Sequence, residues 1–211
     1  MKPLFAIALI AAVLVSAAAR ADFNEGVAAY QAGDYRRAAE IWTADAQAAN
    51  PAAQRNLGIL YLNGLGVPRN PSQAAAWFRQ AADQGYAPAA ANLADLYLKG
   101  TGVTRDLTTA ARFMTQAAEG GIAESQHNLA VLYEHGVGVE KNRDTAITWY
   151  RRAARLGFEQ SRTRLLALVP DEAPPEPEPV AEAPEPAQPP SGKPDGDGLV
   201  DRLVFLFAPA N

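Results

Sequence analysis

The sequence predicts an all-α repeat protein in which pairs of helices stack in a row. Two observations carry this prediction. A short glycine motif returns at a spacing of 36 residues along the 211-residue chain, and a period of this length is typical of stacked repeats. Within each repeat, apolar residues recur at intervals of three and four, which places them on one face of a helix.

The glycine motif occurs three times, as LYLNGLGVPRN, LYLKGTGVTRD and LYEHGVGVEKN. A tyrosine, two glycines and a valine stay in register through the copies: Tyr61, Gly64, Gly66 and Val67, then Tyr97, Gly100, Gly102 and Val103, then Tyr133, Gly136, Gly138 and Val139. The first glycine of each copy follows an apolar helical stripe, where a left-handed residue ends a helix at little cost for glycine. The motif is therefore predicted to be a loop between two helices.

Each repeat is expected to contain two helices. The first carries a leucine stripe that ends in the tyrosine of the motif: Leu57, Leu60 and Tyr61, Leu93, Leu96 and Tyr97, and Leu129, Leu132 and Tyr133. The second starts at a residue whose side chain can accept hydrogen bonds from free helix amides, namely Asn70, Asp106 or Asn142. It then alternates alanines with an aromatic residue, Trp77, Phe113 or Trp149, so that two helices can pack closely with the ring between them. Gly85, Gly121 and Gly157 are expected to end it.

The period divides the chain into segments. Residues 22–51 are a shortened first unit with a tight turn at Gly33 and Asp34, and full repeats follow over residues 52–87, 88–123 and 124–158. Residues 159–169 are predicted to form a single capping helix that covers the last apolar face, with Arg162 and Arg164 on a more polar surface.

The pattern A-x-x-x-L-G-x-x-Y-x-x-G-x-G-V, followed by a capping residue and A-x-x-W-x-x-x-A-A-x-x-G, resembles the Sel1-like repeat, a longer-loop relative of the tetratricopeptide repeat. Residues 52–158 match it, with Ala94 and Ala130 where the first copy has Gly58, and Phe113 in place of tryptophan. Residues 22–51 are more similar to an ordinary tetratricopeptide unit. The resemblance implies a right-handed superhelical solenoid of antiparallel helix pairs, and an adaptor that binds other proteins.

The N-terminal segment, residues 1–21, has the layout of a secretory signal peptide. Lys2 precedes an apolar run that ends in Ala19-Arg20-Ala21, so cleavage is expected after Ala21 and the mature protein is expected in the periplasm or outside the cell. An uncleaved membrane anchor is the alternative. No later segment is long and apolar enough to predict stable membrane insertion after cleavage. Because the chain has no cysteine, thiol and disulfide chemistry are excluded.

The C-terminal part changes composition abruptly. Residues 170–198 hold ten prolines and eight acidic residues, which predicts a disordered, extended Pro/Glu-rich linker. Residues 199–211 begin with the apolar stretch LVDRLVFLF, whose spacing favours a helix. This segment is predicted either to dock on the solenoid or to bind a partner, which would make the protein a switch whose tail occupies the groove until a partner displaces it, or a bivalent adaptor. The net charge is +1 over residues 22–170 and −7 over residues 171–211, so nucleic acid is not an expected partner.

The first helices are predicted to line a concave groove that binds a protein or peptide partner. The candidate partner-binding residues are Arg55, Asn56, Ile59, Asn63, Asn92, Asp95, Lys99, His127, Asn128, Glu134 and His135. Asn56, Asn92 and Asn128 share one repeat position, where they either hydrogen-bond a neighbouring turn or clamp the backbone of an extended peptide.

No cofactor, metal or catalytic site is predicted. His127 and His135, the only histidines, are eight residues apart, whereas helical metal sites place ligands three or four apart. Asp45, Asp83 and Glu119 are expected on solvated helix faces, and no nucleophile and base can be assembled. The sequence therefore predicts an exported scaffold and not an enzyme. One alternative is a periplasmic regulator of an envelope sensor or receptor, and a less favoured one is an enzyme acting on a cell-wall or drug substrate.

Overall fold

The computed structural model describes residues 23–171 and 174–177, and in this part of the chain the regular elements are all helices. Residues 23–31 are helical. The elements that follow are α2 (Tyr35–Gln47), α3 (Pro51–Asn63), α4 (Pro71–Asp83), α5 (Ala87–Lys99), α6 (Leu107–Glu119), α7 (Ala123–His135), α8 (Arg143–Arg155) and α9 (Glu159–Leu168). The predicted signal peptide, most of the acidic linker and the apolar segment from residue 199 lie outside the described residues.

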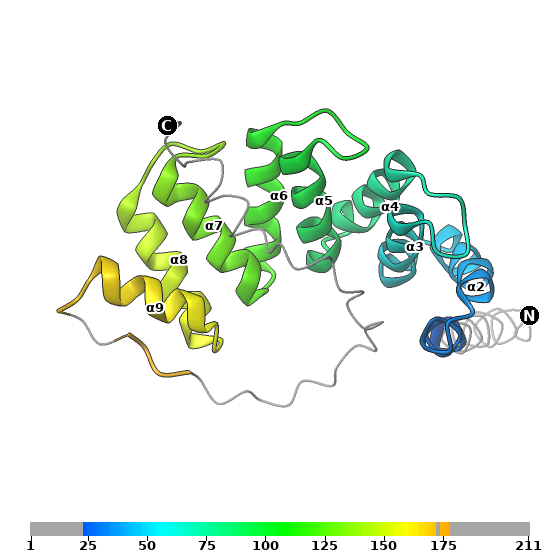
Figure 1. Cartoon of the computed structure of the whole chain (residues 1–211), viewed down its shortest axis with the longest axis horizontal. Helices are drawn as coiled ribbons and strands as arrows, with labels where there is room; N and C mark the ends of the chain where they lie inside the picture. The colour runs from blue at the N-terminus through cyan, green and yellow to red at the C-terminus, as the bar shows by residue number, and fades with distance from the viewer. Residues whose placement is uncertain (1–22, 172–173, 178–211) are drawn as a thin grey trace, which may run out of the picture.

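The helices follow one another along an arched row from α2 to α9 (Figure 1). Each helix packs chiefly on its two neighbours in the sequence, so the pairs α3–α4, α5–α6 and α7–α8 stack side by side and α9 packs on α8. This nearest-neighbour packing is the defining property of a solenoid. It confirms the predicted fold class, a helical solenoid of antiparallel pairs.

The helix ends form as the sequence predicts. Asn70, Asp106 and Asn142 each cap the second helix of a repeat by accepting hydrogen bonds from its first-turn amides, and Asp34 does the same for α2. At the other junction, Gly64, Gly100 and Gly136 have φ angles of 71°, 70° and 74° and end the first helices. Glycine adopts this left-handed conformation without the steric cost that a Cβ would bring.

The second glycine of each loop sets the distance between repeats. A Cβ on Gly102 would lie 2.3 Å from the carbonyl carbon of Pro71, the first residue of α4. Gly66 lies against Tyr35 and Gly138 against Leu107 in the same way, at the first residues of α2 and α6. The backbone of each loop therefore touches the start of the second helix of the preceding pair, and a side chain at these positions has no room.

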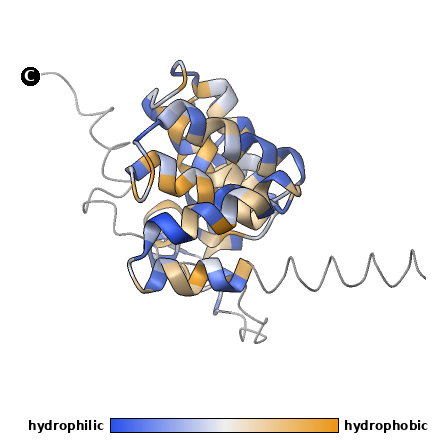
Figure 2. Ribbon diagram, turned by 90° about the vertical axis from the view of Figure 1, so that its right-hand side faces the viewer, coloured by the Kyte–Doolittle hydropathy of each residue, from blue (hydrophilic) through white to orange (hydrophobic). Residues whose placement is uncertain are grey.

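The core consists of alanines and leucines around a few large rings. The sequence pattern placed Trp77, Phe113 and Trp149 between the helices, and Phe113 and Trp149 are buried, with exposed fractions of 0% and 9%. Trp77 is only partly buried, and the fully buried ring of its helix is Phe78. Each helix carries both hydrophobic and hydrophilic residues (Figure 2), as expected for elements that bury one face.

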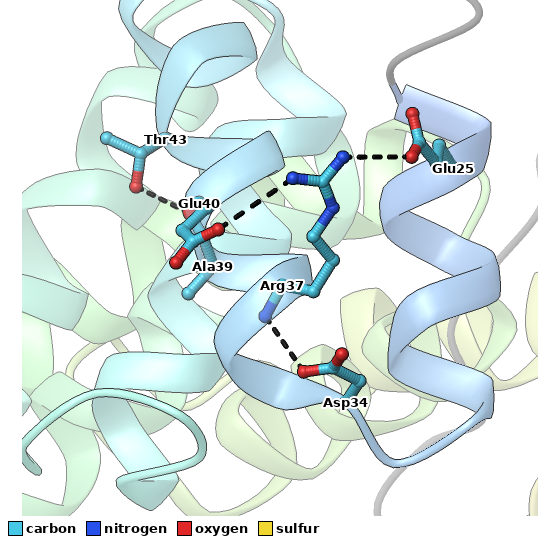
Figure 3. Close-up of polar contacts among 6 residues, drawn as sticks. All are labelled: Glu25, Asp34, Arg37, Ala39, Glu40 and Thr43. Carbon is cyan, nitrogen blue, oxygen red and sulfur yellow. Dashed lines mark hydrogen bonds and ion pairs between the residues drawn. The ribbon is translucent and has the colours of Figure 1, made fainter.

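The first unit is held partly by polar contacts (Figure 3). The Arg37 guanidinium on α2 lies 3.0 Å from the Glu25 carboxylate, on the helix that covers residues 23–31, and 3.9 Å from Glu40. The Arg37 amide donates to Asp34, the capping residue. Since the side chains of this ion pair are more than half exposed, it fixes an orientation and contributes little to stability.

Candidate partner-binding surface

The candidate surface runs along the first helices of the repeats, α3, α5 and α7. The structure leaves most of the predicted residues within reach of solvent: Asn63, Lys99 and His135 are exposed, and Arg55, Ile59, Asn92, Asp95 and Glu134 are partly buried. The first helices α3 and α5 also contact each other through side chains, Arg55 and Asn92. The candidate residues of these two helices thus lie side by side.

Three predicted residues do not face a groove. Asn56, His127 and Asn128 are 3%, 3% and 4% exposed, so the expectation that they line an open surface is wrong. Among the three asparagines that share one repeat position, Asn56, Asn92 and Asn128, only Asn92 is partly exposed. Sequence spacing alone does not separate the two outcomes, because the same helical position is covered or open according to the bulk of its neighbours.

Arg55 and Asn92 connect two repeats. The Arg55 Nε donates to the Asn92 Oδ1 at 3.1 Å, and both side chains are partly buried. Burial lowers the pKa of Arg55, although the nearby Tyr86 and Tyr30 hydroxyls act in the opposite direction. Moving a guanidinium out of water costs free energy unless its N–H groups are hydrogen-bonded. Packing alone therefore does not favour an arginine at position 55.

Asp95 and Lys99 form an ion pair within α5. The Lys99 Nζ lies 2.6 Å from the Asp95 Oδ2, and about a third of each side chain is exposed, 33% and 32%. Such a pair, one helical turn apart, contributes only a few tenths of a kcal/mol to stability. Both groups therefore remain available to exchange this contact for one with a partner.

His127 is a packing residue at the end of the row. Its Nδ1 lies 2.8 Å from the Ser161 Oγ on α9, and its ring centroid is 5.2 Å from that of Tyr150 and 5.0 Å from that of Phe158. Its Nε2 is buried and has no hydrogen-bond partner among the described residues. Burial lowers the pKa of His127 to about 4, against a smaller raising effect of Glu134. The imidazole is therefore neutral at physiological pH.

Glu134, like His127, attaches α7 to α9. Its carboxylate accepts a hydrogen bond from the Tyr150 hydroxyl at 2.8 Å and pairs with the Arg164 guanidinium of α9. Burial raises the pKa of Glu134, but the hydrogen bonds from Arg164 and Tyr150 outweigh it and lower the pKa overall. Burial and the bond to Glu134 together raise the pKa of Tyr150. Glu134 therefore holds α9 in place, and its side chain, only 12% exposed, is largely withdrawn from the surface on which it was predicted.

Tyr150, Ser161 and Arg164 were not predicted to have this role. Arg164 was expected only on the polar outer surface of the cap, yet it reaches back to α7. The 36-residue period shows that Arg164 and Glu134 depart from the residues found at the same positions of the other repeats. Arg164 occupies the repeat position of Asn56, Asn92 and Asn128, and Glu134 occupies that of Leu62 and Leu98. Two charged residues of opposite sign replace uncharged ones at the same end of the array.

One further expectation concerns an isolated polar residue, Asp45. Asp45 was expected on a solvated face, but it is 4% exposed on α2, so that expectation is wrong.

Among the described residues, no group of three or more His, Asp or Glu side chains is placed to hold a metal ion. No helix in the same part of the chain is long and apolar enough to cross a membrane.

Comparison with known proteins agrees with this geometry. The family model described as Sel1 repeat matches residues 51–86, 87–122 and 123–158. A Sel1 repeat protein from Oxalobacter formigenes superposes with a TM-score of 0.67 and 33% sequence identity, over 74% of this chain and 62% of that one. A protective antigen of uropathogenic Escherichia coli strains, also with a Sel1-like repeat fold, gives a TM-score of 0.67 and 34% identity.

The alignment with the Escherichia coli antigen covers 71% of this chain and 33% of the antigen. The chain thus spans less than two thirds of the length of either protein. The helix pairs, the two glycines of each loop and the matched residues 51–158 all lead to one assignment: the chain belongs to the Sel1 repeat family.

Proposed function

We propose that the protein is a scaffold that binds a protein or peptide partner through the row of first helices, α3, α5 and α7, on the concave side of the arch. Sel1 repeat proteins typically mediate protein–protein interactions, and the chain shares their fold. The coarse function follows from the family, whereas the surface is argued from this chain's own residues.

One observation carries the choice of surface. Residues that pack the core hardly change from repeat to repeat, as with Leu57, Leu93 and Leu129. Residues on the open face of the same helices change. The exposed Asn63, Lys99 and His135 share one repeat position, and the partly buried Ile59 and Asp95 share another. Because packing does not dictate the open positions, their mixture of aliphatic and charged side chains supports recognition of a specific partner.

Site-specific photo-crosslinking in the full chain tests this surface. A photoreactive amino acid at Ile59, Asp95 or Lys99 is expected to crosslink one and the same partner. The matched control is the same substitution at Ala76 or Thr148, which are exposed on the second helices α4 and α8. Equal crosslinking of that partner from the control positions would contradict the proposed surface.

We also propose that the mature chain acts in the periplasm or outside the cell. The support is the layout of residues 1–21, with a basic start, an apolar run and a small-residue site at Ala21. Fractionation of cells that express the full chain, followed by N-terminal mass determination, is expected to find a product starting at Asp22. A full-length protein in the cytoplasm would contradict it.

A further inference from the structure

Arg55 is a partly buried cation whose charge no described carboxylate neutralises. It lies on α3, and its Nε donates to Asn92 at 3.1 Å. A guanidinium has five N–H donors in a planar fork that matches a carboxylate. The bond to Asn92 uses one of them and leaves the outer edge of the fork free of any described acidic partner.

The other charged residues of the row differ from Arg55 in this respect. Lys99 pairs with Asp95 on α5, and Glu134 pairs with Arg164 between α7 and α9. Each of these charges already has an opposite charge beside it. Arg55 therefore marks the place on the row where a ligand carboxylate would find an unneutralised and partly desolvated cation.

The repeat pattern shows that the helices form without an arginine at this position. The equivalent positions 36 and 72 residues further along are Ala91 and His127, and the repeats around them form the same helices. Burial lowers the pKa of the Arg55 guanidinium, which means that the position disfavours the charge. A residue that the architecture does not require, kept at such a cost, is typical of a binding site.

An acidic ligand is available within the chain. Residues 171–198 hold eight acidic residues against one lysine and are rich in Pro-Glu pairs. Extended at about 3.1 Å per residue, this segment reaches about 85 Å. Six helix-to-helix steps separate α9 from α3 along the row, or about 60 Å at about 10 Å each. Counted from Leu168, Glu185 reaches only about 53 Å, whereas Asp195 reaches about 84 Å. The aspartates at the far end of the segment, Asp195 and Asp197, are thus able to return to Arg55.

We propose that Arg55 is a carboxylate-binding residue of the partner-binding surface and that the chain's own acidic segment, residues 171–198, is its ligand. This proposal rests on the proposed function, because it makes the acidic segment a competitor for the same row of helices. Asp195 or Asp197 accepts two hydrogen bonds from the Arg55 fork while Asn92 orients the guanidinium from the other side. The partly buried Tyr86 is close enough to act on the charge of Arg55, and Pro194, next to Asp195, can pack on such a ring.

Proteolysis of the full chain tests the contact. A protease that cuts before aspartate is expected to cut at Asp195 and Asp197 about tenfold more slowly in the wild type than in Arg55→Gln at low ionic strength. The difference is expected to vanish at about 0.5 M salt, where such charges are screened. Arg36→Gln, the same charge change on an exposed arginine of α2, is expected to behave as the wild type. Arg55→Lys keeps the charge without the fork and is expected to restore only part of the protection.

A peptide-binding measurement gives an independent readout. A labelled peptide of residues 171–198 is added to a full chain whose own eight acids in that segment are changed to amides. Its affinity is expected to fall about tenfold when Arg55→Gln is added, and not with Arg36→Gln. Matching thermal unfolding curves of the two variants ensure that the loss does not come from misfolding.

Cleavage of the acidic segment at the same rate in the wild type and Arg55→Gln would overturn the proposal, as would peptide binding that Arg55→Gln leaves unchanged. Binding of another acidic peptide at Arg55 without binding of the chain's own segment would overturn the choice of ligand. In each of these cases the crosslinking at Ile59, Asp95 and Lys99 is unaffected, so failure here is distinguishable from failure of the proposed function.

Discussion

Individual polar side chains attach α9 to the helices before it. His127 and Glu134 on α7 contact Ser161 and Arg164 on α9, and Tyr150 joins them from α8. A buried imidazole contributes to stability only while it stays neutral, because its charged form would lose hydration without gaining a partner at Nε2. Helix α9 is thus attached through a group that titrates.

His127 therefore makes folding pH-dependent. Its pKa is about 4 in the folded protein and about 6.5 in an unfolded chain. Between these values the unfolded state binds a proton that the folded state does not, so the free energy of unfolding falls as the pH drops from about 6.5 to about 4, by up to about 3 kcal/mol. Urea unfolding at several pH values is expected to show a shallower decrease for His127→Gln. The exposed His135→Gln is the control, and an equally shallow profile in both variants would contradict this assignment.

At the scale of the elements, glycine performs two different tasks. At Gly85, Gly121 and Gly157 the φ angle is +80° to +85°, and a Cβ would meet nothing within 4 Å. At Gly66, Gly102 and Gly138 the φ angle is also positive, but a Cβ would lie within 2.3 Å of the backbone of the preceding helix pair. The first kind of glycine permits a helix end, and the second also permits two repeats to approach.

Substituting alanine separates the two tasks. Gly121→Ala is expected to cost about 1 kcal/mol of unfolding free energy, the cost of a left-handed alanine. Gly102→Ala adds a collision with the Pro71 carbonyl and is expected to cost at least about 3 kcal/mol, or to shift the repeats apart. Chemical denaturation of both variants measures the difference, and equal losses would show that the contact between repeats does not limit stability.

At the scale of the whole molecule, the helices between residues 23 and 168 have no central core that all of them share. Each helix is stabilised chiefly by the helices before and after it, so the ends have fewer contacts than the middle. After α8 the row continues with α9, where Leu165 is 1% exposed while the adjacent Leu166 is 51% exposed. The capping helix therefore protects the array through one side and presents the other to solvent.

Weakening the cap is expected to loosen the array from that end. Leu165→Ala leaves a cavity that costs about 2–4 kcal/mol, whereas Leu166→Ala is expected to change stability by less than about 0.5 kcal/mol. Hydrogen exchange of the full chain is expected to become faster in α8 and α9 of Leu165→Ala, with α3 and α4 little affected. Uniformly faster exchange in every helix would instead indicate a single cooperative unit.

The sequence by itself determined the helices, their ends and their period. Caps such as Asn70, glycines such as Gly64 and the leucine stripes act within one or two turns, so local physics suffices to predict them. Only the tertiary structure decided which residues of the row are covered. Arg55 and His127 occupy the same repeat position, yet Arg55 is partly open and His127 is buried beneath α9. Burial depends on what the next repeat brings against a side chain, and that is a contact between segments distant in sequence, which no local pattern contains.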